Sequence, residues 1–376
     1  MVNKLLNELG ISADEQSYLS RYDFDDEAFL ALQKDLADGR FATSRNQVSG
    51  EVAPPEPSDL LAWPQPDSAA RRQYEELGNQ ALAEGAVAIV ILNGGMATRF
   101  GGRVKGIVDV TPGRSFLGYR LADIAHSGHP ITVFLMSSFA TEKATGEHLR
   151  EHDRFGISPD RLHCLTQKIS VRLTQGGELF RDAQGAVSFY APGHGDLFDV
   201  LAGAPEFHRF AANGGKMVTV GNVDNLGATV SPVVLGAHLA QRKPVTVEVA
   251  ARAPGDKGGA PARWQGRVQV LEGFRFPSGF AIESIPVFST NTMVVDASSI
   301  RTDYKLTWFR AEKEVGGTPV VQFERLMGEV TSFVPSTYLT VPREGADNRF
   351  LPVKTPQDLE SLRPVIAARL SYLEKT

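Results

Sequence analysis

The residues best placed for chemistry follow a short apolar run, GAVAIVIL, that ends at Leu92. The chain then reads NGGMATRFGGRVKG, which combines Gly94 and Gly95 with two cations, Arg99 and Lys105. Two glycines at the carboxyl end of a buried strand let the backbone approach a ligand closely, and free amides in such a turn form an anion-binding concavity. The pattern therefore predicts a phosphate-binding turn, while a glycine turn with two solvated cations is the alternative.

A second loop of small residues, APGHGD, opens a short helix. A helix N-terminus with exposed amides suits an anion or a base edge, and a Pro-Gly turn with Asp196 as the helix cap fits the residues equally well. The loop does not complete a Rossmann fingerprint, because Phe198 stands where Gly193-His194-Gly195 would need a third glycine. The Walker spacing is absent around Lys105 as well, so the sequence disfavours an ATPase and a simple dehydrogenase.

A third polar loop, GNVDNLG, follows an apolar run that ends at Val220. Asn222 and Asp224 are poor core residues, and ligands in open α/β sheets bind at the carboxyl ends of the strands. Mg²⁺ usually takes one or two carboxylates together with phosphate oxygens. Asp224 is therefore a candidate Mg²⁺ ligand, and an Asx turn is the alternative.

Two other features have weaker functional interpretations. Residues 148–152, HLREH, match the inverted zinc-protease pattern H-x-x-E-H, but the stretch is strongly charged and no downstream ligand pattern supports it. An exposed helix face is the favoured interpretation. Cys164 lies in an apolar run and is expected to be a small buried side chain. It is the one cysteine of the chain, so no intrachain disulfide can form.

From Gly85 onward, short runs rich in Val and Ile alternate with helical stretches. The runs are GAVAIVIL, ITVFLMS, GKMVTVGNV and PVTVEVAA, and the helical stretches are 115–126, 142–155 and 231–242. This alternation predicts an α/β fold with a Rossmann-like, mainly parallel sheet covered on both faces. The stretch 266–295 is richer in β signals and predicts antiparallel strands, which would make the sheet mixed.

The two ends of the chain have a different texture. Residues 1–41 carry helical spacing and many acidic residues, and five prolines between positions 54 and 66 predict an extended linker or strap. Ser68 is expected to cap a helix that stops at Gly85, and Thr355 to cap a closing helix with Pro356 in its first turn.

Composition narrows the possible partners and location. The chain has 376 residues, of which 42% are hydrophobic and 22% charged, so it can bury a sizeable core. A net charge of −5 gives no general attraction to nucleic acid or to anionic lipid, and neither partner is expected. The longest clean apolar run is too short to cross a bilayer, and the N-terminus has no secretory pattern, so we expect a cytoplasmic protein.

Together, these motifs resemble those of the UDP-glucose pyrophosphorylase family, the UTP–glucose-1-phosphate uridylyltransferases of the eukaryotic type. The resemblance runs from about Ala86 to Leu359 and is carried, in chain order, by ILNGGMATRFGGRVKG, SFLGYRLADI, FLMSSFATEKAT, HCLTQ, YAPGHGDLFDVL, GKMVTVGNVDNLGATVSP, DKGG, FSTNT and NRFLPVKTPQDL. It implies a sheet of the nucleotide-diphospho-sugar transferase type. It also implies an N-terminal helical segment with a Pro-rich linker (1–84), a nucleotidyltransferase domain (85–350), and a segment with a catalytic lysine and the closing helix (351–376).

The resemblance assigns a role to individual residues. The catalytic cations would be Lys105, Lys354 and Arg99. The nucleotide would be bound by Leu92, Asn93, Gly94, Gly95, Gln167 and Gly193, with Gln167 reading the uracil edge. The sugar phosphate would be bound by His194, Asn222, Val223, Asp224, Gly259 and Asn291, with Lys257 and Gly258 beside them. Asp224 would also hold Mg²⁺.

The implied reaction forms UDP-glucose and pyrophosphate from UTP and glucose-1-phosphate, by in-line attack of the sugar phosphate on the α-phosphorus of UTP. Such a reaction needs positioning and charge neutralisation rather than a catalytic triad, which agrees with the residue types above. One alternative is a uridylyltransferase for another sugar-1-phosphate, of galactose or N-acetylglucosamine, because Ser289 and Thr292 stand where the family usually has asparagines. The other is a non-catalytic nucleotide-sugar binding protein, because Ala97 replaces a loop glycine.

The resemblance also bears on assembly. Eukaryotic members of the family continue after the lysine segment into a β-helix that mediates assembly, whereas only 22 residues follow Lys354 here. A monomer or weak dimer is therefore expected.

Overall fold

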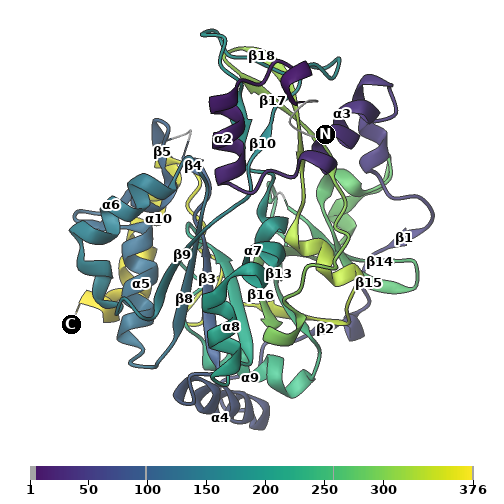
Figure 1. The fold of residues 1–376 in the computed structure, drawn as a ribbon. Helices are drawn as coiled ribbons and strands as arrows, with labels where there is room; N and C mark the ends of the chain where they lie inside the picture. The colour runs from purple at the N-terminus through teal and green to yellow at the C-terminus, as the bar shows by residue number, and fades with distance from the viewer. Residues whose placement is uncertain (1–5, 98–99, 257, 375–376) are drawn as a thin grey trace.

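A computed structural model of the protein describes residues 6–97, 100–256 and 258–374. At its centre lies an eight-stranded sheet with the order β2–β19–β13–β16–β12–β3–β8–β9 (Figure 1). The strands are β2 (Leu60–Leu61), β3 (Val87–Leu92), β8 (Thr132–Ser137), β9 (Leu162–Thr166), β12 (Met217–Asn222), β13 (Val245–Ala251), β16 (Val287–Asp296) and β19 (Ser336–Val341). Neighbouring strands run parallel except at β16, which is antiparallel to both β12 and β13. The predicted α/β fold with a mixed, mainly parallel sheet is confirmed.

Helices cover both faces of this sheet, which explains why β3, one of its inner strands, is apolar at every position. In β3 the odd-numbered residues 87–91 belong to one apolar cluster and the even-numbered ones to another. The first cluster is completed by α4 (Ala69–Ala83), α5 (Phe116–His126), α9 (Pro232–Gln241) and α10 (Pro356–Arg369). The second is completed by α7 (Leu197–Gly203), α8 (Pro205–Ala212) and the hairpin of β14 (Ala260–Trp264) and β15 (Arg267–Leu271).

Side-chain caps fix where the helices on the first face begin. Ser68, Ser115, Ser231 and Thr355 each accept a hydrogen bond from a backbone N–H three residues further on. The caps predicted at Ser68 and Thr355 are confirmed, and Thr355 forms a reciprocal capping box with Asp358.

The N-terminal helices α2 (Ala13–Arg21) and α3 (Asp26–Ala37) pack away from the central sheet, near the upper end of the molecule (Figure 1). They share a third apolar cluster with the short strands β10 (Ser170–Val171) and β11 (Phe189–Tyr190) and with β18 (Thr318–Glu324), the partner of β17 (Phe309–Val315). The Pro-rich segment is extended, as predicted. Its two short strands pair at sheet edges, β1 (Val52–Ala53) with β14 and β2 with β19.

The prediction that Cys164 is buried is wrong, because its side chain is exposed. Cys164 lies on β9, the edge strand, where no residue is fully covered by the elements around it. Within the described ranges, no helix combines the length and apolar character needed to cross a membrane.

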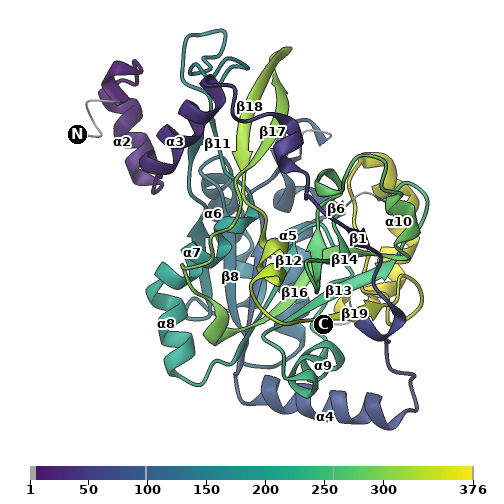
Figure 2. The same ribbon diagram turned by 90° about the vertical axis from the view of Figure 1, so that its right-hand side faces the viewer.

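Helices α4 and α9 lie against each other below the sheet (Figure 2), and two glycines allow their close approach. A Cβ added at Gly78 would lie 1.9 Å from the carbonyl oxygen of Pro232, and one at Gly236 would lie 1.8 Å from that of Tyr74. Each backbone therefore fills the space that a side chain on the other helix would need.

We expect Gly236→Ala to lower the free energy of unfolding by about 1–3 kcal/mol, because overpacking outweighs the gain of roughly 1 kcal/mol in helix propensity. The matched control is Gly146→Ala in α6 (Glu142–Glu151), where an added Cβ meets nothing within 4 Å. It should raise the stability by up to about 1 kcal/mol. Urea unfolding measures the free energy of unfolding of both variants. Equal changes in the same direction would contradict the close packing of α4 against α9.

Candidate functional site

A cavity of about 310 Å³ opens at the carboxyl ends of β3, β8 and β12. The order of connections reverses here, because β3 is followed along the chain by β8 on one side, whereas β12 returns to its other side. Ligands of open α/β sheets bind at such a switch point. The lining residues are Leu92, Gly94, Gly95, Lys105, Met136, Gln167, Ala191, Gly193, His194, Asn222, Val223 and Asp224.

A second cavity of about 170 Å³ adjoins the first, and His194, Asn222 and Asp224 line both. Its other lining residues are Asn225, Gly258, Gly259, Glu272, Phe288, Ser289, Thr290, Asn291, Phe350, Pro352 and Lys354. The two cavities thus bring together three segments far apart in sequence: the loops after β3 and β12, and the segment before α10. Of the sequence-predicted site residues that the structure describes, all line one of these cavities except Asn93. Arg99 and Lys257 lie outside the described residues.

Asn93 is placed behind the site rather than in it. Its side chain is fully buried, and its Nδ2 donates a hydrogen bond of 2.9 Å to Thr145 Oγ1 on α6. A Cβ at Gly106 would come within 2.2 Å of Asn93 Oδ1, so the amide packs against the turn that follows Lys105. Asn93 therefore supports the glycine turn and does not face the cavity.

Gln167 connects two glycine loops across the first cavity. Its Nε2 donates to the carbonyl oxygen of Gly193 at 2.9 Å. Its Oε1 lies where a side chain at Gly94 would have to be, 2.1 Å from an added Cβ. Gly193 has φ 91°, and an added Cβ there would meet the carbonyl oxygen of Arg325 at 2.5 Å, so this position also requires glycine.

Lys105 is not a solvated surface lysine, since only 11% of its side chain is exposed. Its Nζ donates to the carbonyl oxygen of Val353 at 2.5 Å and lies 3.8 Å from Asp224 Oδ2. The ammonium also lies over two aromatic rings, 4.5 Å from the centroid of Phe100 and 5.0 Å from that of Phe116. These contacts hold the cation at the floor of the first cavity.

Asp224 is the carboxylate between the two predicted lysines. Burial raises the pKa of its carboxyl group, while the positive charges of Lys105 and Lys354 oppose that rise. Lys354 is itself exposed and lines the second cavity. One carboxylate facing a space that two cations also line fits a Mg²⁺ ion held with phosphate oxygens.

Asn225 fastens the loop after β12 to the segment that carries Lys354. Its Oδ1 accepts hydrogen bonds from the backbone N–H groups of Gly227 and Leu351, and its Nδ2 donates to the carbonyl oxygen of Arg349. Backbone bonds extend this contact on both sides, from Leu226 N to Leu351 O and from Val353 N to Asp224 O. We call this set of bonds the Asn225 clasp.

A buried ion pair anchors the clasp to the sheet. The Arg349 guanidinium makes two bonds to the Glu248 carboxylate on β13, at 2.7 and 2.9 Å, and both side chains are at least 97% buried. Arg349 also donates to the carbonyl oxygen of Thr229, and Arg120 on α5 donates to that of Asn225. Such paired, hydrogen-bonded charges are the form in which charges are tolerated in a core.

A β-bulge aims Asn291 into the second cavity. Glu248 and Val249 are adjacent on β13 but pair with Thr292 and Ser289, so two residues of β16 are left without partners on β13. Asn291, one of these, has φ 59° and donates from Nδ2 to Asn222 Oδ1 at 3.0 Å. The sequence-predicted residues Asn222 and Asn291 are thus in direct contact.

His194 lies where the two cavities meet and is held neutral. Its Nδ1 accepts the backbone N–H of Met327 at 3.0 Å, so the ring proton must be on Nε2 in the neutral form. Burial lowers the pKa of His194 to about 4. The ring therefore offers an uncharged N–H donor at neutral pH.

Asp196 does not cap its helix through its side chain. Instead its carboxylate is fully buried and accepts from Arg325 Nη2 at 2.5 Å. Burial raises the pKa of Asp196 to about 6, and Arg325 opposes the rise. This pair fixes the loop 193–196 against the segment after β18, so its role is positioning.

Glu272, which no motif in the sequence indicated, lines the second cavity from the end of the β14–β15 hairpin. Burial raises the pKa of its carboxyl group, while the charge of Arg275 and the backbone N–H of Gly259 oppose that rise. Phe288 and Phe350 form an edge-to-face pair in the same cavity, with ring centroids 5.1 Å apart. A carboxylate beside apolar rings suits hydroxyl groups on a ring-shaped ligand.

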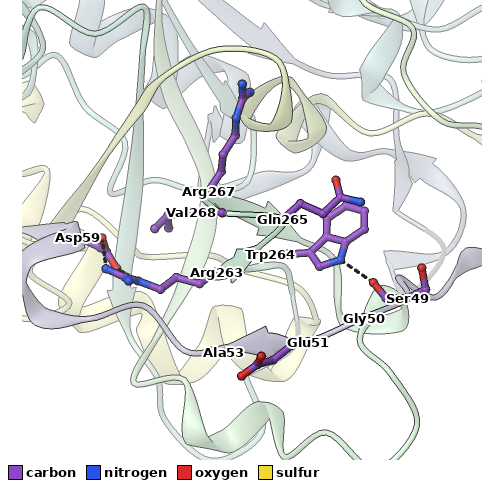
Figure 3. Close-up of a pocket in the computed structure, with 11 residues that line it drawn as sticks. Ser49, Gly50, Glu51, Ala53, Asp59, Arg263, Trp264, Gln265, Arg267 and Val268 are labelled. Atoms are coloured by element: carbon purple, nitrogen blue, oxygen red, sulfur yellow. Dashed lines mark hydrogen bonds and ion pairs between the residues drawn. The ribbon is translucent and has the colours of Figure 1, made fainter.

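A separate cavity of about 670 Å³ lies along the β14–β15 hairpin (Figure 3). Several of its polar groups already pair with each other. Arg263 binds Asp59 at 2.7 and 3.0 Å, and Trp264 Nε1 donates to the carbonyl oxygen of Ser49. It lies outside the switch point and is not part of the candidate site.

Known proteins resemble this chain over most of its length. The sequence profile of the family described as UTP--glucose-1-phosphate uridylyltransferase matches residues 43–366. The chain belongs to this family. A protein of that name from Solanum tuberosum is 31% identical over 293 residues, covering 72% of this chain and 60% of its own length. One from Hordeum vulgare is 29% identical, covering 81% and 65%. The chain therefore matches less than two thirds of the length of these relatives.

Solved structures share the fold of this family member. UDP-glucose phosphorylase from Trypanosoma brucei is 23% identical with a TM-score of 0.73, covering 96% of this chain and 77% of its own. Uridine diphosphate N-acetylglucosamine pyrophosphorylase from the same organism, in complex with an inhibitor, is 18% identical with a TM-score of 0.76, covering 96% and 81%. Both support the nucleotide-diphospho-sugar transferase type of fold.

The environment of His194 in this uridylyltransferase-family chain leads to a prediction about its charge. Its pKa of about 4 lies below the value near 6.5 of an unfolded histidine. The stability that comes from the neutral ring is therefore present above pH 6.5 and is lost as the pH falls from there through 4, because the unfolded chain takes up the proton first. Imidazole ¹⁵N NMR at pH 5 should find His194 neutral and protonated on Nε2, and titration near pH 6.5 would contradict the buried environment.

Proposed function

We propose that this protein is a UTP–glucose-1-phosphate uridylyltransferase that forms UDP-glucose and pyrophosphate. The observation that carries the proposal is the convergence of Lys105, Asp224 and Lys354 at the meeting point of two cavities. The larger cavity, lined by glycine turns and Gln167, would take the nucleotide, and the smaller one would take the sugar. A pure binding protein has no need to concentrate two lysines and a carboxylate where the two ligands meet.

The reaction requires alignment of the two substrates and neutralisation of their phosphate charge. The free amides of the Gly94-Gly95 turn would hold the triphosphate, and Lys105 and Lys354 would balance the charge that shifts toward the leaving pyrophosphate. His194 would donate Nε2–H to a phosphate oxygen or a sugar hydroxyl without adding charge. Asn291 and Glu272 would bind sugar hydroxyls in the second cavity.

Mg²⁺ is part of this proposal, with Asp224 as its protein ligand. A bound Mg²⁺ would neutralise phosphate charge. Because this site offers Asp224 as the carboxylate at the junction, the remaining ligands would come from phosphate oxygens and water.

Pyrophosphate release with UTP, Mg²⁺ and a panel of sugar-1-phosphates tests the proposal. Glucose-1-phosphate should give the highest kcat/KM. Preference for galactose- or N-acetylglucosamine-1-phosphate would support uridylyltransferase activity but with a different sugar phosphate as substrate. Absence of turnover with every sugar phosphate, together with saturable binding of UDP-glucose, would identify a nucleotide-sugar binding protein instead.

Lys354→Ala and Lys105→Met should each lower kcat by about 10²–10³, because each removes a preorganised charge that faces the reacting phosphates. Methionine is chosen at position 105 because it keeps the apolar stem between Phe100 and Phe116. Added Mg²⁺ should not rescue either variant, since the ion has its own ligand in Asp224.

The matched control is Lys34→Ala in α3, where 71% of the lysine side chain is exposed and pairs with Asp38. It should leave turnover unchanged and stability within about 0.5 kcal/mol. If either site variant keeps more than about a third of wild-type turnover at saturating substrate, that lysine does not act in the transition state.

Gln167→Glu should reduce the preference for UTP over CTP by about tenfold, corresponding to roughly 1.5 kcal/mol for one hydrogen bond. A carboxamide can donate to O4 and accept from N3–H of uracil, whereas a carboxylate only accepts. The ratio of kcat/KM for the two nucleotides is the measurement. An unchanged ratio would restrict Gln167 to its observed bond with Gly193.

A further inference from the structure

The HLREH stretch, which the proposed reaction does not use, forms a compact cluster at the end of α6. Ligand atoms of His148, Glu151 and His152 all lie within 4.8 Å of one another. Spacing of three and four residues places them on one face of the last helical turn. His148 is half-buried, and Glu151 and His152 are exposed.

Hydrogen bonds around the two imidazoles leave one ring nitrogen of each available as a metal ligand. His152 Nδ1 lies 3.0 Å from the carbonyl oxygen of His148, which can only accept, so Nδ1 carries the proton and Nε2 is unprotonated in the neutral ring. His148 Nε2 lies 2.7 Å from Ser115 Oγ. In the tautomer where Nε2–H donates to that oxygen, His148 Nδ1 is the free lone pair. Histidine ligands of metals almost always donate their second ring N–H to an oxygen in this way.

The two rings are held in place by Phe155. This ring stacks on His152 at 4.9 Å and 14°, and its centroid lies 5.4 Å from that of His148. On its far side it fills the notch at Gly118, where an added Cβ would meet the Phe155 ring at 2.8 Å. A turn with three successive non-glycine residues at positive φ, Asp153 to Phe155, brings the ring there.

We propose that His148, Glu151 and His152 form a surface site for a divalent transition metal of the zinc type, separate from the Mg²⁺ site at Asp224. Two imidazole nitrogens and one carboxylate oxygen are ligands that Zn²⁺ prefers, whereas Mg²⁺ prefers oxygen ligands alone. A tetrahedral Zn²⁺ ion with bonds near 2.0 Å needs ligand atoms roughly 3.4 Å apart. Small rotations of the exposed Glu151 and His152 side chains would bring the ligand atoms to that separation. The C-terminal end of α6, where carbonyl groups point outward, adds further attraction for a cation.

Calorimetric titration of the full chain with Zn²⁺, without nucleotide, tests the site. We expect one strong equivalent per chain. His152→Ala should weaken it by more than about tenfold, because removing a direct ligand costs at least as much as removing an outer partner. Glu151→Gln should weaken it less, since an amide oxygen remains. Millimolar Mg²⁺ should not displace the bound Zn²⁺.

The matched control is His208→Ala, which removes an exposed histidine from helix α8. It should bind Zn²⁺ as the wild type does. The proposal is overturned if no strong equivalent is found, if His152→Ala binds as tightly as the wild type, or if His208→Ala loses binding equally. Displacement of the bound Zn²⁺ by Mg²⁺ would indicate that Zn²⁺ binds at Asp224, and this result would overturn the proposal as well. None of these results depends on whether the uridylyltransferase reaction is observed.

Discussion

The Asn225 clasp is the constraint on which the candidate site depends. Asp224 and Lys354 are 130 residues apart in sequence, and they approach only because the loop after β12 is hydrogen-bonded to residues 349–353. The same segment supplies the carbonyl oxygen of Val353 that receives Lys105. One buried amide therefore brings together groups from three parts of the chain. The Arg349–Glu248 pair ties this arrangement to the central sheet.

The charged groups of the site leave an excess of positive charge that an anionic ligand would neutralise. Lys105 and Lys354 both act on the carboxylate of Asp224, whose side chain is 24% exposed, and their charges oppose the rise in pKa that its partial burial causes. A triphosphate entering the first cavity would bring several negative charges to two cations that share one protein anion. A divalent cation at Asp224 would then take over part of the neutralisation. The charges here are suited to a phosphorylated ligand, whereas the Arg263–Asp59 pair in the cavity of Figure 3 is already balanced.

Local patterns predicted the elements and the loops, because those depend on neighbours in sequence. Apolar runs located β3, β8, β12 and β13, and serine or threonine before a helical stretch located the caps at Ser68 and Thr355. Glycines and polar residues at strand ends indicated Gly94, Gly95, Asn222 and Asp224, whereas Gln167, Gly259, Asn291 and Lys354 were indicated by the family resemblance alone. The features that local patterns did not predict depend on tertiary packing. The exposure of Cys164 follows from the edge position of β9, and the pairing of Asp196 with Arg325 joins residues 129 positions apart. Asn93 stands among cavity residues in sequence but faces the interior. Glu272 enters the second cavity through a hairpin whose path no local pattern indicates.

Uncharged hydrogen-bond donors stand beside the two lysines in the site. The junction of the cavities already holds two cations, and a third would have to be stabilised by another buried anion or by the ligand itself. His194 avoids this requirement, because burial and the bond from Met327 N–H keep its ring neutral with Nε2–H available. Asn291 serves in the same way from the β-bulge of β16, with an amide already oriented by Asn222. In the proposed reaction, the site would therefore add specific hydrogen bonds to a sugar phosphate without changing its own net charge, and that separation of charge from specificity is what a transfer between two phosphorylated substrates requires.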